Sequence, residues 1–258
     1  MPPPSTVRTG WARVRLVVLL ALLLATVAWA VKQWRRGPLR ADWEGGVRVA
    51  VLLLATDAVS SDAATPLRDA LGAAEDWAAA EAARFGVERR PFDFVVLGPF
   101  EAPNNPPAIP GADATFFQRV RAAWRFWRFR QAADALAEVE VSAAAVEVYV
   151  VLDPESRAKG EASFEGVAQE GQRWGFVRGN VDAAFELAVA VLHETFHCVG
   201  ATDKYDEAGR PTAAARTVDR GRPTAELMVG EIAGHAGRLP RSFDELEVGP
   251  VTAEELGW

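Results

Sequence analysis

Alternating apolar and polar stretches along the chain predict a layered domain of strands and helices. Thr65-Pro66 is typical of a helix start, and Gly86 stands where that helix should stop. A second long helix is expected from Asp113, as its N-cap, to about residue 137. Five segments have the apolar pattern and length of strands: 47–54, 92–97, 146–152, 164–168 and 174–177. Strands that alternate with helices indicate an α+β domain with α/β-like layering.

Length, cysteine count and charge restrict the class of protein. The chain has 258 residues, which suits one domain or at most two. Cys198 is the only cysteine, so an intrachain disulfide framework and a multi-cysteine zinc ribbon are excluded. Residues 1–40 hold seven of the 28 basic residues and no acidic one, which leaves 21 basic against 35 acidic residues in 41–258. This acidic balance argues against nucleic acid as a partner.

The N-terminal segment has the pattern of a membrane-targeting sequence. Leu16–Val31 is apolar except for Thr26, with arginines before it and basic residues after it. This run predicts a retained membrane anchor, with the domain outside the cytoplasm and the membrane as a partner. A cleaved signal peptide followed by secretion, with a cleavage site near Ala28-Trp29-Ala30, and a buried helix are the alternatives. We expect residues 1–40 to form this segment, and 41–258 to form the catalytic domain and to be a monomer.

Basic and aromatic residues interleave in the predicted helix before residue 137. Phe117, Val120, Trp124 and Trp127 follow three-to-four spacing and predict an apolar stripe that packs against the domain. Contact of the same stripe with an anionic membrane surface is a second interpretation, and nucleic-acid binding is a third.

Two of the three histidines point to metal chemistry. His193 and His197 are four residues apart in a segment that predicts a helix capped by Asn180, so both rings leave one side of that helix. Two imidazoles in this arrangement can bind one Zn²⁺. Glu194 lies one position around the helix, where a carboxylate can act as a base rather than a ligand.

A catalytic zinc site needs a third protein ligand, and Asp203 is the leading candidate. Gly200 can end the helix in a left-handed conformation, and the turn that follows can bring Asp203 to the same metal. Glu226 and His235 are its rivals. We expect Glu226 to belong to a turn below the site, and His235 stands in a segment with little to orient it.

The string from His193 to Asp203 is HExxHxxGxxD, which resembles the metzincin metalloproteases in the variant with aspartate as third ligand. Snapalysin-like bacterial neutral proteases share that substitution. Tyr205 follows the aspartate as it does in those proteases, and Glu226-Leu227-Met228 is similar to the methionine turn. Gly230 departs from the family pattern, which often has a tyrosine there. The resemblance implies a zincin with a mixed twisted sheet, an active-site helix and an edge strand within 164–168.

The resemblance also implies a function. The chain would be a zinc-dependent endopeptidase that cleaves peptide or protein substrates with a metal-activated water, with Glu194 as general base and His193, His197 and Asp203 as ligands. Cys198 is expected to be buried rather than a ligand. Two alternatives stay open, a non-catalytic metal- or peptide-binding domain and a structural domain without metal.

Overall fold

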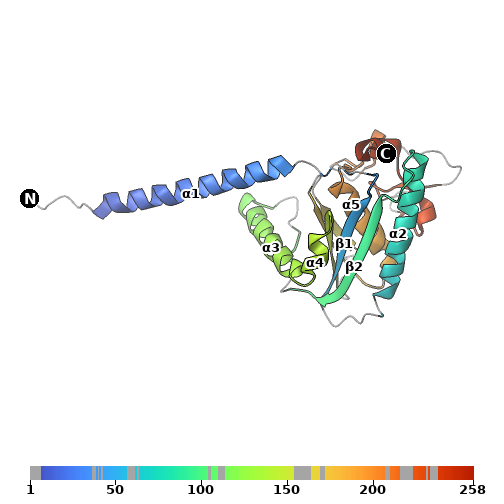
Figure 1. Ribbon diagram of the computed structural model, residues 1–258, viewed down its shortest axis with the longest axis horizontal. Coiled ribbons are helices and arrows are strands. Elements are labelled where there is room, and N and C mark those ends of the chain that lie inside the picture. The colour runs from blue at the N-terminus through green and yellow to red at the C-terminus, as the bar shows by residue number, and fades with distance from the viewer. Residues whose placement is uncertain are drawn as a thin grey trace, which may run out of the picture. The chain divides into compact units, whose positions relative to one another are not determined.

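The computed structural model describes residues 7–36, 39, 41, 43–56, 62, 64–103, 106–109, 114–153, 164–168, 172–206, 210–215, 223–230, 232 and 238–258. The chain divides into two compact units, Met1–Gly37 and Pro38–Trp258, and each is described by itself. The first unit holds α1 (Val7–Arg36), a single helix (Figure 1). No helix among the described residues has the length and apolarity that crossing a membrane requires. The membrane anchor expected from the apolar run at 16–31 stays a prediction.

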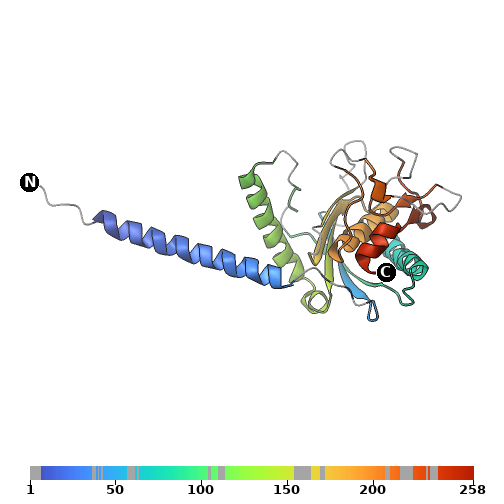
Figure 2. The ribbon, with the colours of Figure 1, turned by 90° about the horizontal axis from the view of Figure 1, so that it is seen from above.

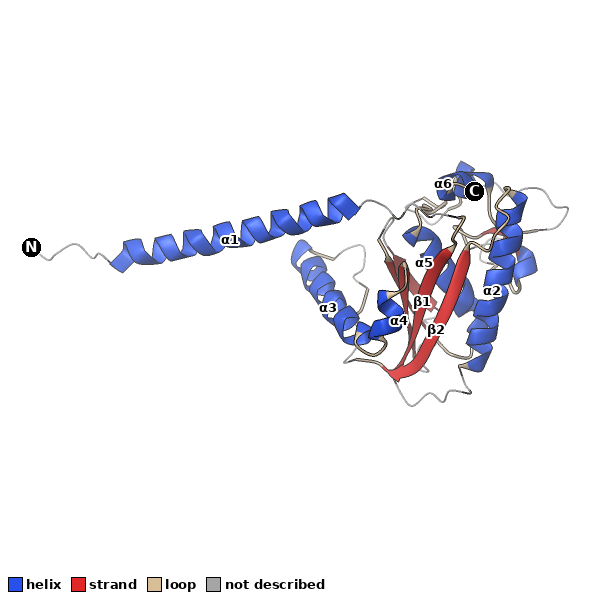
Figure 3. Ribbon diagram, in the orientation of Figure 1, coloured by secondary structure: helices blue, strands red, loops and turns tan. Residues whose placement is uncertain are grey.

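The second unit is built on a five-stranded mixed sheet with the order β2-β1-β3-β5-β4 (Figure 3). The first four strands in this order are parallel, and β4 is an antiparallel edge strand. All five strand predictions are confirmed, with these bounds: β1 (Val47–Ala55), β2 (Phe92–Glu101), β3 (Val146–Leu152), β4 (Phe164–Ala168) and β5 (Trp174–Gly179). The mixed sheet and the five α-helices described in this unit confirm the layered α/β character.

Helices cover both faces of the sheet. Figure 2 shows α3 (Phe116–Asp134) on one side and α5 (Ala184–Cys198) with α2 (Thr65–Arg84) on the other. Because side chains alternate along a strand, β1 contributes to two cores. Its residues Val49 and Val51 belong to the core under α2 and α5, and its residues Leu52 and Leu54 belong to the core under α3. This double burial explains the apolar run at 49–55 in β1.

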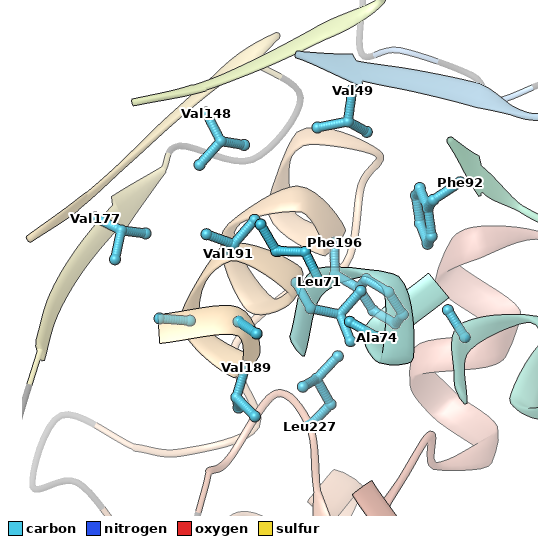
Figure 4. Packing of buried hydrophobic residues seen from close by; sticks show 14 of the residues in the cluster. Val49, Leu71, Ala74, Phe92, Val148, Val177, Val189, Val191, Phe196 and Leu227 are labelled. Carbon is cyan, nitrogen blue, oxygen red and sulfur yellow. The ribbon is translucent and has the colours of Figure 1, made fainter. Parts of the chain in front are cut away.

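The core on the α5 side fixes the helix that carries both histidines. In Figure 4, Val148 and Val177 of the sheet point toward Val191 of α5, while Leu71 of α2 and Leu227 lie on the other sides of that helix. Almost every residue of α5 from Leu187 to Cys198 is buried, His193 being the exception. A helix enclosed in this way presents its two histidines from a rigid support.

The structure corrects two expectations for the long helices. Thr115 caps α3 through a reciprocal pair of hydrogen bonds with Gln118, whereas Asp113, the expected cap, lies outside the described residues. Helix α2 does begin at Thr65, but its N-cap is Ala64, without a side-chain hydrogen bond. The bounds of α3 end three residues before the expected position, and the short α4 (Glu138–Ser142) follows.

The apolar stripe predicted for α3, which includes Trp124 and Trp127, does not pack against the domain as expected. The buried side chains of α3 are Phe126, Phe129 and Ala133. Phe126 and Phe129 contact the ring of Phe176 edge-on, at centroid distances of 5.2 and 5.9 Å. The stripe lies on the opposite side of the helix, where Trp124 is 55% exposed and Trp127 is 56% exposed. The helix carries apolar residues on two sides, and only the side with Phe126 and Phe129 packs against the sheet.

The C-terminal segment closes the domain near α5. It contains two short paired strands, β6 (Ala225–Glu226) and β7 (Leu246–Glu247), two 3-10 turns at Ala213–Ala215 and Phe243–Glu245, and α6 (Pro250–Leu256). Trp43 donates from Nε1 to the carbonyl of Leu256 at 2.8 Å, and its ring contacts Trp258. The last helix is thereby held beside the start of β1.

Candidate metal centre

The two histidines of α5 and Asp203 converge on one point. His193 Nε2 and His197 Nε2 are 3.1 Å apart. Asp203 Oδ1 lies 3.4 Å from the first nitrogen and 3.2 Å from the second. Among the described residues, these three form a group whose ligand atoms lie close enough together to hold a metal ion. The structure thus brings together the three residues that the sequence proposed as ligands.

Backbone carbonyls fix the orientation of both rings. His193 Nδ1 lies 3.0 Å from the carbonyl oxygen of Leu227, and His197 Nδ1 lies 2.9 Å from that of Ala201. A carbonyl oxygen only accepts, so each Nδ1 carries the hydrogen. In the neutral rings the two Nε2 atoms then present lone pairs toward each other and toward the carboxylate. Three electron-rich atoms that face one another need a proton or a cation between them.

Without a cation, protons fill that need. Burial raises the pKa of Asp203, but its contacts with both imidazoles outweigh this and hold the pKa well below its usual range. Burial lowers the pKa of His193, but the Asp203 hydrogen bond and the nearby charge of Glu194 raise it more, so the net shift is upward. Both shifts express the same attraction between a carboxylate and positive charge at this point.

The separations also match what a metal requires. In a tetrahedral site with bonds of 2.0–2.1 Å, ligand atoms lie about 3.3–3.4 Å apart. The three observed separations, 3.1, 3.2 and 3.4 Å, are close to that value. Two imidazoles and one carboxylate form a donor set that suits Zn²⁺ and leave a fourth position open. The two histidines and the aspartate therefore fit a zinc ion.

A turn after α5 delivers Asp203. Gly200 has a φ of 113°, a left-handed conformation that side chains disfavour, and the amide of Ala201 donates to the carbonyl of Phe196 at 3.0 Å. The chain therefore reverses directly after His197. The glycine has the role that its position in the sequence predicted.

A buried ion pair holds the residues on either side of Asp203. Lys204 is 1% exposed, and its Nζ lies 2.6 Å from Glu255 Oε2 on α6. The same glutamate accepts a hydrogen bond from the backbone amide of Thr202 at 2.9 Å, and the Lys204 amide donates to the carbonyl of Met228 at 3.0 Å. These contacts position the third candidate ligand, and sequence reasoning missed them. The two charged residues are 51 positions apart, and no motif connects them.

Glu194 is buried beside the histidines and is only partly satisfied. It is 5% exposed, and its Oε2 has no hydrogen-bond partner. Burial raises its pKa, which the positive charge of His193 and His197 and a backbone hydrogen bond from Ala168 partly offset. A buried carboxylate with one free oxygen and a raised pKa is suited to accept a proton from a bound molecule.

Two glycines in the sheet leave room for that carboxylate. A Cβ at Gly166 on β4 would stand 2.3 Å from Glu194 Oε1, and a Cβ at Gly175 on β5 would stand 2.9 Å from Glu194 Cβ. Gly166 is paired with Val177, and Gly175 with Ala168, so both glycines lie on the sheet face that α5 covers. Sequence reasoning did not single out either glycine, because their role appears only when strand and helix meet.

An open cavity of about 300 Å³ lies next to His193 and Glu194. Its wall is mostly apolar and comes from α5, from the turn at 227–230 and from Leu239-Pro240. Glu186 adds a carboxylate to this wall. The cavity can receive a side chain of a molecule held at the metal centre.

Glu226 and the predicted methionine turn lie beside the metal centre without contributing a ligand to it. Glu226 accepts from Thr252 Oγ1 at 2.7 Å and from the amides of Met228 and Gly249 at 2.6 and 3.3 Å, so its carboxylate joins the turn to α6. Met228 is fully buried in the same core as Phe196. The turn meets the site through the Leu227 carbonyl. His235 lies outside the described residues.

Two remaining residues near the motif are also placed. Tyr205 forms a hydrogen bond with the Asp203 carboxylate, and burial together with this negative charge raises the pKa of its hydroxyl. It also lines the cavity and is partly exposed. Cys198 is fully buried, as expected, and burial raises the pKa of its thiol. Neither residue belongs to the three-residue group.

No protein-family model matches this chain, and no curated protein matches it.

Proposed function

We propose that this chain is a zinc-dependent endopeptidase. The observation that carries the proposal is the convergence of His193, His197 and Asp203 beside a buried carboxylate with an unpartnered oxygen. A metal site that only stabilises a fold is usually closed by four protein ligands and has no need of a base. Three ligands with Glu194 next to them are the arrangement of a hydrolytic site.

Each residue has a separate task in peptide hydrolysis. When bound, Zn²⁺ acts as a Lewis acid that lowers the pKa of a water toward about 7 and polarises a carbonyl. Glu194 Oε2 takes the proton of the attacking water and delivers it to the leaving nitrogen. The Leu227 and Ala201 carbonyls keep both histidines in the tautomer that leaves Nε2 free. Tyr205 holds the carboxylate of Asp203 through its hydroxyl.

The edge of the sheet favours an extended peptide as substrate. β4 is the last strand in the sheet order, and its backbone runs past Glu194 through Gly166. An extended segment can add to such an edge by main-chain hydrogen bonds, which places a peptide bond near the centre. The apolar cavity then accepts one substrate side chain. The metzincin-like motif, including the methionine turn at 226–228, supports the same reaction class and remains part of the proposal.

Metal analysis and peptide digestion of the purified full chain test the proposal. We expect one zinc per chain, cleavage of a mixed peptide library, loss of cleavage with a chelator and recovery with added Zn²⁺. The Glu194→Gln variant should keep the zinc and lose about 10²–10⁴-fold in cleavage rate, because an amide cannot take the proton. Glu88→Gln, a change at an exposed carboxylate, is the matched control and should cleave as the wild type does.

Three results would overturn parts of the proposal. A wild-type chain without metal affinity would refute the metal centre. A chain that binds zinc without cleaving any peptide would be a non-catalytic metal-binding domain. Wild-type cleavage by Glu194→Gln would show that another group is the base.

A further inference from the structure

The N-terminal half of α3 lies outside both cores. None of the residues 116–125 is buried, and the buried residues of the helix begin at Phe126. Figure 2 shows this end of the helix standing away from the sheet. Five large apolar residues on it are between 51% and 81% exposed: Phe116, Phe117, Val120, Trp124 and Trp127. We call them the aromatic stripe. So large a set of exposed aromatic residues marks an interaction surface.

Helical geometry gathers the aromatic stripe on one side. At 3.6 residues per turn, its five positions fall within an arc of roughly 100°. Phe126, Phe129 and Ala133, which face the sheet, lie on the opposite side of the helix. The aromatic stripe therefore points away from the domain, where nothing in the described part of the chain covers it.

Arginines border the aromatic stripe on both sides. By the same geometry Arg121, Arg125 and Arg128 follow one border and Arg119 stands on the other. All four are exposed, and Arg128 lies over the ring of Trp124 at 5.1 Å. The helix has no acidic residue before Asp134, although acidic residues outnumber basic ones by 35 to 28 in the whole chain. Positive charge is thus concentrated around this one apolar surface.

We infer that the aromatic stripe of α3 docks on an anionic membrane surface, with the helix lying in the plane of the interface. Tryptophan and phenylalanine side chains favour the boundary between headgroups and acyl chains, and arginines on the borders of such a stripe reach lipid phosphates. Nucleic acid accounts for the arginines, but it would leave the phenylalanines and Val120 without an apolar partner. A second copy of the chain would bring the arginines together and repel. An anionic lipid surface offers an apolar partner to the aromatic stripe and phosphates to the arginines.

A probe on the stripe reports docking of α3 itself in the full chain. The only native cysteine, Cys198, is buried, so the Val120→Cys variant can be labelled selectively with an environment-sensitive fluorophore. Vesicles of phosphatidylcholine and phosphatidylglycerol should increase and blue-shift its emission, and vesicles of phosphatidylcholine alone should have much less effect. The same label on Ala83→Cys, an exposed position on α2, is the control and should stay in water. This control separates docking of α3 from recruitment by any other segment.

Charge variants test the role of the border. Each arginine near an anionic surface strengthens binding about fivefold, so the triple variant Arg121→Gln, Arg125→Gln and Arg128→Gln should bind about a hundredfold more weakly. Raised salt should weaken wild-type docking in the same direction. The matched control removes three exposed arginines elsewhere, with Arg48→Gln, Arg89→Gln and Arg241→Gln, and should lose much less affinity.

Four results would overturn the inference. The label at position 120 could remain in water with anionic vesicles, or respond equally to neutral vesicles. It could become buried with single-stranded or duplex nucleic acid and not with lipid. It could also become buried without vesicles in a concentration-dependent way, which would identify a second copy as the partner. Since none of these measurements involves zinc or peptide cleavage, their outcome is independent of the proposed activity.

Discussion

Replacing Gly166 by alanine tests whether β4 sets the position of the Glu194 carboxylate. The added methyl carbon would stand 2.3 Å from Glu194 Oε1 and 3.1 Å from Cδ. Real Cβ atoms almost never come within 3.0 Å of a neighbour, so the carboxylate must retreat by about 0.7 Å or more. A displacement of about 1 Å in a catalytic group costs on the order of 100-fold in rate. We therefore expect cleavage to fall about 100-fold.

Zinc affinity should remain within a few fold of wild type, because the three atoms nearest to the added methyl carbon all belong to Glu194 and none to a ligand. The loss of folding stability should be small, about 1 kcal/mol, since the carboxylate is the far end of a flexible side chain. Gly175→Ala should behave differently. Its methyl group would press on Glu194 Cβ at 2.9 Å, which moves only with the backbone of α5. This variant should lose about 1–3 kcal/mol and also bind zinc more weakly.

Urea unfolding, zinc competition with a chelator dye and peptide cleavage measure the three quantities. Gly72→Ala on α2 is the control, because a Cβ there meets nothing within 4 Å. It should leave cleavage unchanged and raise stability by up to about 1 kcal/mol. In a Glu194→Ala background, Gly166→Ala should cost no stability, because the carboxylate that it meets is gone. Wild-type cleavage by Gly166→Ala, or an equal stability loss in both backgrounds, would refute this account of the carboxylate.

Three further predictions concern the ligand turn and the cavity. Asp203→Ala should weaken zinc binding at least about 10-fold and Asp203→His should restore it, so unchanged affinity in the alanine variant would refute this ligand. Burial alone would raise the pKa of Glu255, but hydrogen bonds from Lys204 and Thr202 bring it below the ordinary 4.5, so its ionised form stabilises the fold above that pH. At pH 7 Glu255→Gln should therefore be less stable than wild type by about 3 kcal/mol, because the buried charge of Lys204 loses its carboxylate partner. This difference in the free energy of unfolding should shrink as the pH falls below about 4.5. A difference of constant size in urea unfolding at pH 7 and pH 3 would contradict it. Glu186→Gln should lower kcat/KM for library peptides with lysine or arginine beside the cleaved bond while sparing apolar ones, and parallel losses for both would remove Glu186 from the substrate pocket.

The sequence determined the features of this protein that depend on neighbours along the chain. Apolar segments predicted all five strands, and the nearly continuous runs of β1 and β3 reflect burial on both faces of the sheet. The spacing of His193 and His197 predicted a shared side, because it is a property of any helix. The turn through Gly200 predicted the approach of Asp203, since a left-handed residue after the helix reverses the chain within a few positions.

Only the tertiary structure decided which apolar side of α3 packs against the sheet. α3 has two apolar sides, and its sequence periodicity favoured the tryptophan side for packing. The sheet instead accepts Phe126 and Phe129, because their rings meet Phe176. The aromatic stripe is thereby left exposed. Periodicity shows that a helix has an apolar side, but contact with another element determines whether that side is buried.

The support of the site likewise depends on residues that the chain brings together from a distance. Gly166 and Gly175 matter because β4 and β5 pass against Glu194, and an isolated glycine in a strand does not reveal what approaches it. Lys204 can be buried because Glu255 arrives from α6, 51 residues away. Local sequence specified the ligand atoms, whereas the folded chain supplied the space and the charges that hold them, because those depend on long-range packing.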